Sequence, residues 1–138
     1  MTPENNILIV TPRMEELAAL CRSNTLIEAG LYREYDVKRG LRDVNGKGVL
    51  AGLTNISDII AQREVDGILQ PCPGELYYRG IRIEELVQGF VREGRKGYEE
   101  VAYLLLFGRL PDAKELGSFK SLLAQGRMLP TNFTRDVI

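Results

Sequence analysis

The sequence contains no histidine and no tryptophan, and only two of its 138 residues are cysteines. Without histidine, the chain cannot form a Ser-His-Asp or Cys-His catalytic arrangement from its own residues. The two cysteines, Cys21 and Cys72, do not follow the ligand spacing of a zinc site or of a disulfide framework. The sequence therefore predicts no catalytic, cofactor-binding or metal-binding residue in this chain.

An excess of charge of one sign is also missing, since 18 Lys and Arg face 19 Asp and Glu and the net charge is −1. Proteins that bind nucleic acid or anionic membranes usually carry a basic excess, so neither partner is expected. The longest apolar run, Val101 to Phe107, is far shorter than the roughly 20 residues of a membrane span. The N-terminus MTPENNILIV has no basic region before a long apolar segment, so no secretory signal is visible. We expect a cytoplasmic location.

What is present is typical of a globular protein, with 44% hydrophobic and 27% charged residues. Cys21 follows Leu17 and Leu20 on one helical face, which predicts a buried, inert thiol. Cys72 lies between two prolines, which predicts a loop. A redox role for Cys72 has no support, because no neighbouring residue would activate its thiol.

The first forty residues form a predicted helical N-terminal extension, 1–40. Thr11 followed by Pro12 is a helix start, with an N-cap and a proline at the first helical position. The polar run at residues 23–25 ends this helix, and a second short helix is expected from Ile27 to Tyr35, where Gly30 interrupts it.

A small β-hairpin is predicted after Gly40, at about residues 48–80. Residues 43–48 are rich in turn formers, and Val49 to Ile60 has the β-branched and small residues of a strand. Asp66-Gly67 is a strong turn signal, and Leu76 to Tyr78 can pair back as the second strand. The fold class expected is mainly α, with a small antiparallel β-hairpin or sheet near the N-terminal third.

The remaining sequence has helical periodicity, with helices expected at about 82–90, 97–108 and 112–126 and the start of another at 131–138. Gly108 is placed as a C-terminal glycine, and Asp112 with Glu115 forms a capping box. Val101 to Phe107 is apolar on all sides, which predicts a fully buried helix. The uncapped helix start at 131–138 leads us to expect a truncated chain.

Several charged or glycine-rich motifs have two interpretations. Gly40 to Gly48 does not match a phosphate-binding loop, because no Ser or Thr follows Lys47, so a hairpin turn is favoured. Lys38, Arg39 and Arg42 could hold an anion or form a solvated cluster balanced by aspartates. Arg79 could bond carbonyls at a strand–helix corner or act in catalysis, and the structural role is favoured. The pairs Glu84-Glu85 and Glu99-Glu100 lie in first helical turns, where the helix dipole favours them.

Two longer runs carry a family resemblance. GELYYRGIRIEEL (74–86) followed by EEVAYLLLFGRLP (99–111) resembles the N-terminal part of the large domain of citrate synthases. GVLAGLTNIS (48–57) is similar to the first strand of that family, and the similarity covers roughly Val37 to Ile138. The 1–40 extension resembles the bacterial branch, and 41–138 would be the N-terminal portion of the large domain.

The resemblance implies a mainly α-helical homodimer that condenses acetyl-CoA with oxaloacetate to citrate and CoA in the tricarboxylic acid cycle. The family's catalytic histidines and aspartate lie downstream of the matched stretch, so no catalytic residue is carried over. Arg42 lies near a basic position that contacts CoA phosphates in some members, but the turn-rich insert breaks the correspondence. The chain alone is expected to be inactive, supplying scaffold and part of the subunit interface. The alternative is a naturally short self-association or partner-binding module.

Overall fold

The computed structural model describes residues 9–46, 48–127, 133 and 137. It contains the helices α1 (Pro12–Asn24), α2 (Ala29–Glu34), α3 (Ile83–Arg92), α4 (Tyr98–Phe107) and α5 (Ala113–Gln125), and the strands β1 (Ser57–Val65), β2 (Ile68–Tyr78) and β3 (Ile81–Arg82). The strands form one antiparallel sheet in the order β1-β2-β3. The expected fold class, mainly helical with a small antiparallel sheet, is confirmed. No helix among the described residues combines the length and hydrophobicity that a membrane span requires.

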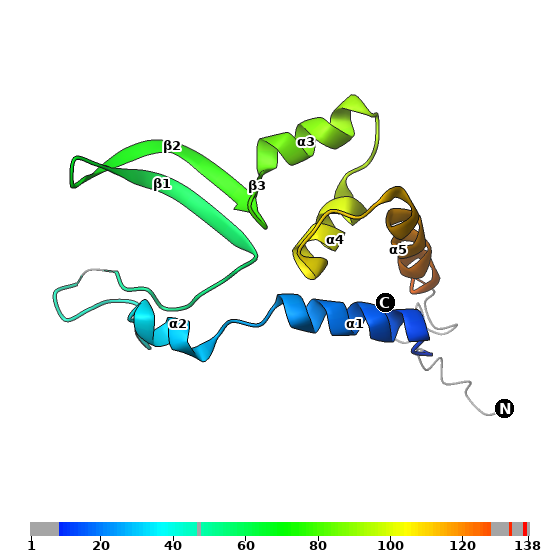
Figure 1. Cartoon of the computed structure of the whole chain (residues 1–138), viewed down its shortest axis with the longest axis horizontal. Helices are drawn as coiled ribbons and strands as arrows, with labels where there is room; N and C mark the ends of the chain where they lie inside the picture. Colours follow the sequence, from blue (N-terminus) through cyan, green and yellow to red (C-terminus); the bar gives the residue numbers. More distant parts are fainter. Residues whose placement is uncertain (1–8, 47, 128–132, 134–136, 138) are drawn as a thin grey trace.

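The helices α1, α3, α4 and α5 lie at one end of the molecule, and the hairpin projects from them (Figure 1). α1 and α5 both pack against α4, whereas α3 lies against β2 and β3. α2 and the irregular chain that follows it lie on the same side as the hairpin (Figure 1). The described residues from 25 to 78 include none that is buried, so the core is confined to the helical end.

The core is an aromatic cluster closed by one leucine. Tyr103 and Phe107 from α4 and Phe119 from α5 are buried with Leu17 from α1. The three rings meet edge to face, with centroids 4.5, 5.4 and 5.8 Å apart, an arrangement that the ring quadrupoles favour. Cys21 packs against this cluster but is only partly buried, whereas the sequence predicted a buried thiol.

The predicted helix boundaries at caps are confirmed. The side chain of Thr11 accepts a hydrogen bond from the backbone N–H of Met14, and Pro12 occupies the first turn of α1. Gly108 ends α4 in the left-handed region, with φ +79°. Asp112 and Glu115 form a capping box at the start of α5. These signals are local, so the sequence alone is enough to recognise them.

The predicted first strand, Val49 to Ile60, is wrong in its first half, because β1 begins only at Ser57. Ser57 pairs with Tyr78, the last residue of β2, so no partner strand continues alongside residues 49–56 in the described structure. A hydrogen bond from the backbone N–H of Ile56 to Oγ1 of Thr54 (3.2 Å) also turns the chain there. The predicted turn at Asp66-Gly67 is confirmed between β1 and β2.

The loop predicted at Cys72 is also wrong, since this residue lies within β2. Ile60 pairs with Glu75 and Gln62 pairs with Pro71, so residues 72–74 of β2 face Ala61 alone. This β-bulge places the prolines where the regular ladder is interrupted. A Pro-Cys-Pro-Gly run is therefore compatible with a strand here.

The helix expected to be fully buried, Val101 to Phe107, is only partly so. Leu106 is 44% exposed, and Val101 and Leu105 are half-buried, because α1 and α5 cover one side of α4. The second predicted helix is shorter than expected and buries no residue. The helix start predicted at 131–138 lies outside the described residues, apart from Phe133 and Val137.

Two glycines give predictions of opposite sign. A Cβ at position 108 would lie 2.7 Å from Oδ1 of Asn24, and the φ of +79° disfavours any other residue, so Gly108→Ala should lower the unfolding free energy by about 1–3 kcal/mol. Gly117, inside α5, has no neighbouring atom within 4 Å of the place that a Cβ would occupy, so Gly117→Ala should raise it by about 0.5–1 kcal/mol. Urea unfolding of both variants measures these changes, and a stabilised Gly108→Ala variant would contradict the packing.

Glu115 gives a prediction for pH. Arg109 donates hydrogen bonds to both carboxylate oxygens (2.5 and 2.8 Å), and this pairing, together with the backbone N–H of Asp112, lowers the pKa of Glu115 from 4.5 to about 2. Because the folded-state pKa is lowered, the stabilisation is complete above pH 4.5 and is lost as the pH falls towards 2.

Replacing Glu115 by Gln keeps the capping geometry but removes the charge. We expect Glu115→Gln to be less stable than the parent at neutral pH and to flatten the stability profile between pH 4.5 and 2. Circular dichroism during acid titration measures how the stability of each variant changes with pH. Glu84→Gln is the control, because Glu84 is exposed and its contact with Arg82 is long, at 3.4 Å. An unchanged profile for Glu115→Gln would rule out the pair as a source of acid sensitivity.

Candidate functional site

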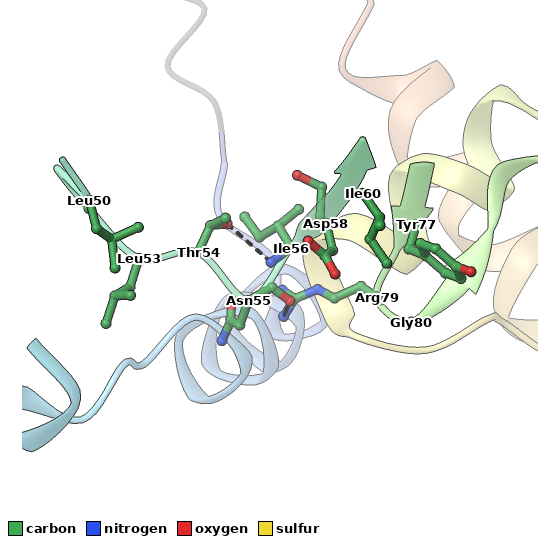
Figure 2. Close-up of a pocket in the computed structure, with 12 residues that line it drawn as sticks. Leu50, Leu53, Thr54, Asn55, Ile56, Asp58, Ile60, Tyr77, Arg79 and Gly80 are labelled. Atoms are coloured by element: carbon green, nitrogen blue, oxygen red, sulfur yellow. Dashed lines mark hydrogen bonds between the residues drawn. The ribbon is translucent and has the colours of Figure 1, made fainter. Parts of the chain in front are cut away.

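An open cavity of about 590 Å³ lies where the chain enters β1 and leaves β2. Its walls come from residues 50–60 and from the corner after β2, including Tyr77, Arg79 and Gly80 (Figure 2). Leu50, Leu53 and Ile60 contribute apolar surface, and Asp58 contributes a carboxylate. The residues that line this cavity are the candidates for a chemical role.

Arg79 forms one wall of the cavity and is the centre of a hydrogen-bonded junction. Its Nε (3.2 Å) and Nη2 (2.9 Å) donate to the carbonyl of Leu105, and its Nη1 donates to the carbonyls of Asn24 (3.0 Å) and Asn55 (3.1 Å). Its backbone N–H also donates to the carbonyl of Ile56 at 2.9 Å. Four of the five guanidinium N–H groups are therefore committed to main-chain carbonyls. The predicted structural role of Arg79 is confirmed.

The backbone at this corner is unusual for a non-glycine residue. Arg79 has φ +49° and Gly80 has φ +82°, so two successive residues occupy the left-handed region. This reversal turns the chain from β2 into β3 and aims the guanidinium back at the helices. The junction offsets the strained backbone by joining α1, α4 and residue 55 through one side chain.

Two asparagines, Asn24 and Asn55, also take part in the junction. Neither was expected there from the sequence. The side-chain Nδ2 of Asn55 donates to the carbonyl of Asn24 at 3.1 Å, and the side chain of Asn24 packs against Gly108. In the sequence Asn24 is visible only as a helix breaker, and Asn55 as part of a strand. No pattern links residues that are 31 positions apart, so the pairing could be seen only in the structure.

A polar network lies on the hairpin beside the cavity. The hydroxyl of Tyr77 donates to Oε2 of Glu75 at 2.6 Å, and Arg63 Nη2 contacts both oxygens of Glu75 at 2.9 Å. The hydrogen bond from Tyr77, followed by that from Arg63, lowers the pKa of Glu75, while Glu75 raises the pKa of Tyr77. Near neutral pH the carboxylate stays ionised and the phenol stays protonated, so neither is suited to exchange protons.

Two of the three basic residues at 38–42, Lys38 and Arg42, bind local partners. Lys38 Nζ binds Oδ1 of Asp36 at 2.5 Å, and this hydrogen bond raises the pKa of Lys38. Arg42 Nη1 donates to the carbonyl of Gly46 at 2.8 Å, within the turn predicted there, and Arg42 bridges to Gly48. These exposed side chains are occupied by local partners, which favours the solvated-cluster interpretation.

The acidic pairs lie in the first turns of α3 and α4, where the sequence placed them. Glu100 binds Arg95, and Glu99 is 3.8 Å from Arg127. Within the described ranges no three His, Cys, Asp or Glu side chains are grouped so that they could hold a metal ion. The geometry supports a structural junction beside a cavity lined by both apolar and polar residues.

Comparisons with known proteins bear on the family of this chain. The family description "Citrate synthase, C-terminal domain" matches residues 40–138. A glyoxysomal citrate synthase of Cucurbita maxima is 32% identical over 115 residues, covering 80% of this chain and 20% of that protein. A citrate synthase of Saccharolobus solfataricus is 42% identical over 57 residues, covering 41% of this chain and 14% of that protein.

A third relative, 2-methylcitrate synthase 1 of Corynebacterium glutamicum, is 33% identical over 85 residues, covering 62% of this chain and 17% of that protein. No solved structure matches the chain significantly. The chain thus spans about a fifth of the length of the curated relatives it matches, or less.

Proposed function

Because this chain belongs to the citrate synthase family, we propose that it is the N-terminal part of an enzyme that condenses acetyl-CoA with oxaloacetate. The products would be citrate and CoA, an acyl transfer of the tricarboxylic acid cycle. The observation that carries the proposal is the family match over residues 40–138. The parent enzyme would be a cytoplasmic homodimer, with 1–40 as an extension and 41–138 as the first portion of its large domain.

Within that enzyme, this chain would supply scaffold and part of the subunit interface. Arg79 ties three chain segments together, and the aromatic cluster packs α1, α4 and α5 into one unit. The resemblance places the enolising and polarising histidines elsewhere, which agrees with the absence of histidine from this sequence. The catalytic groups and the acyl-CoA pocket would come from outside these residues.

The exposed surface supports a role as part of a larger assembly. Large apolar side chains are among the exposed ones, including Val91, and Tyr98, which lines an apolar groove between α3 and α4. Such surface is normally covered by other protein segments. It also suits the alternative function, a short self-association or partner-binding module.

The first test is an activity assay of the 138-residue chain. Purified chain is mixed with oxaloacetate and either acetyl-CoA or propionyl-CoA, and free CoA is followed with a thiol reagent; the second thioester is included because of the 2-methylcitrate synthase relative. We expect no CoA release above the enzyme-free background, since no general base is assembled in the described structure. Turnover by the chain alone would refute the assignment of a scaffold role.

A chimera separates the scaffold role from the alternative module. The 57-residue segment of the Saccharolobus solfataricus citrate synthase that aligns with this chain is replaced by the matching residues of this chain. If the segment is scaffold, a folded chimera should keep most of its synthase activity. A chimera with native mass and circular dichroism but no activity would count against the proposal. An unmodified reading frame that stops after Ile138 would favour the module.

A further inference from the structure

Two exposed turns of the chain contain an amide or acidic residue followed by glycine, Asn45-Gly46 and Asp66-Gly67. In such a pair the backbone nitrogen of the glycine can approach the side-chain carbonyl carbon of the residue before it, because glycine has no Cβ to obstruct the approach. Closure gives a cyclic imide, a succinimide, which is the first step of asparagine deamidation. The proposed function uses neither turn.

Asn45 lies in a turn that begins at Asp43. The backbone N–H of Gly46 donates to the carbonyl of Asp43 at 2.9 Å, and Gly46 has φ +79°. The turn is closed by an isolated bridge between Arg42 and Gly48 and by a hydrogen bond from Nη1 of Arg42 to the carbonyl of Gly46 at 2.8 Å. All five of these residues are exposed. Hydrogen bonds of exposed turns open at little cost in free energy, so the nitrogen of Gly46 is released for reaction.

The other asparagines within the described ranges have a different neighbour. Asn24 is followed by Thr25 and Asn55 by Ile56, so a branched Cβ stands beside the nitrogen that would have to attack. Their side-chain amides also donate to the carbonyls of Leu20 (2.9 Å) and Asn24 (3.1 Å) in the packed region at the end of α1. Ring closure is therefore expected to be slow at both positions.

The turn at Asp66-Gly67 is held more firmly than the turn at Asn45. Asp66 has φ +53° and Gly67 has φ +77°, the conformation of the hairpin turns that match strand twist. Val65 pairs with Ile68 directly beside them, and the ladder of β1 with β2 continues from there. Rotating the backbone of Asp66 would break this ladder. A carboxylate is also ionised near neutral pH, which makes it a poorer target for attack than a carboxamide.

We propose that Asn45 is a site of spontaneous deamidation that passes through a succinimide and yields an isoaspartyl turn. The backbone nitrogen of Gly46 loses its proton and forms a bond to Cγ of Asn45. The bond from Cγ to Nδ2 breaks, and the amide nitrogen leaves as ammonia with that proton. Water then opens the ring at either carbonyl. One opening gives an ordinary aspartate, and the other gives isoaspartate, in which the main chain runs through the former side chain.

The reaction alters the turn and leaves the core intact. Both products place a carboxylate in the turn that Arg42 closes, and isoaspartate also lengthens the main chain, which moves the carbonyl of Gly46 away from its 2.8 Å contact with Arg42. The turn lies away from α4 and α5 (Figure 1). The aged chain therefore stays folded, and its isoaspartyl carboxylate is available to a methyltransferase that repairs such groups. The reaction is independent of the reaction catalysed by the parent enzyme.

Peptide mapping by mass spectrometry of the aged chain tests the proposal. The purified chain is incubated in mildly alkaline buffer, and isoaspartate is quantified by methyl transfer from labelled S-adenosylmethionine. We expect Asn45 to change from amide to acid at least about tenfold faster than Asn24 or Asn55, a barrier difference of about 1.4 kcal/mol. The peptide with Asp66 should gain no isoaspartate. If Asn45 stays intact in the folded chain while a synthetic peptide of residues 42–48 deamidates, the proposal is overturned.

Two glycines of the same turn provide a matched pair of variants. Gly46→Ala places a Cβ beside the attacking nitrogen and should slow deamidation at least about tenfold. Gly48→Ala is the control, because no atom lies within 4 Å of the place that its Cβ would occupy and Gly48 supplies no attacking atom. It should leave the rate unchanged, and circular dichroism checks that both variants are folded. A Gly46→Ala variant that deamidates as fast as the parent chain, or a product with aspartate and no isoaspartate, would refute the succinimide route.

Discussion

Replacing Phe119 by alanine is expected to lower the free energy of unfolding by about 3–5 kcal/mol, the usual cost of removing a buried aromatic ring. Phe119 is 6% exposed and is the buried residue that α5 contributes to the core, where Leu122 and Leu123 pack beside it. Its ring meets those of Tyr103 and Phe107 edge to face, so truncation removes two aromatic contacts along with the buried area. The cavity left behind would lie between α4 and α5.

Chemical denaturation followed by circular dichroism measures this loss. Tyr98→Ala is the matched control, because Tyr98 is also an aromatic residue of this helical unit but is 74% exposed. It should change the unfolding free energy by less than about 0.5 kcal/mol. Phe119→Leu should recover more than half of the loss, since leucine refills most of the volume. Similar values for Phe119→Ala and Tyr98→Ala would mean that the aromatic cluster does not hold the helices together.

Replacing Arg79 by alanine is expected to have the second large effect. It should lower the free energy of unfolding by about 2–4 kcal/mol. The change removes four hydrogen bonds and leaves the carbonyls of Asn24, Asn55 and Leu105 without this donor. Arg79→Lys should rescue little, because one ammonium group cannot span three carbonyls as the planar guanidinium does. In the Arg79→Ala variant, we expect α1 and α4 to be held together less firmly.

Hydrogen exchange locates the effect as well as measuring it. Arg79→Ala should accelerate exchange at the end of α1 and in residues 55–57 more than in α3, since the guanidinium binds the first two segments. Arg82→Ala is the control, because Arg82 is exposed and its contact with Glu84 is long, at 3.4 Å. It should change stability by at most about 0.5 kcal/mol. Uniform acceleration across the chain for Arg79→Ala would argue against a local junction.

Local signals made the helical part predictable from the sequence. Thr11 with Pro12, Gly108, and Asp112 with Glu115 each fix a helix end through bonds within four residues. The start of β1 was not predictable in the same way, because a strand exists only where a partner lies beside it. Residues 49–56 have strand composition, yet β2 turns away at Arg79 before it can pair with them.

The candidate site was predictable in kind and not in detail. That Arg79 would bond carbonyls at a corner followed from its place between a strand and a glycine. Which carbonyls it binds did not follow, because Asn24, Asn55 and Leu105 are distant in sequence and meet only through the packing of α1 on α4. The burial of α4 was overestimated for a related reason, since periodicity cannot say which neighbours are present.

The hydrogen bond between Asn55 and Asn24 has one further consequence. It holds the two ends of residues 25–54 close together. This stretch therefore leaves the body of the molecule and returns next to the residue where it left. Chain that is tethered at both ends in this way can change in length at little entropic cost, because closure entropy grows only with the logarithm of loop size. The stretch is thus a natural place for evolution or engineering to add, shorten or exchange sequence without disturbing the helices beside it.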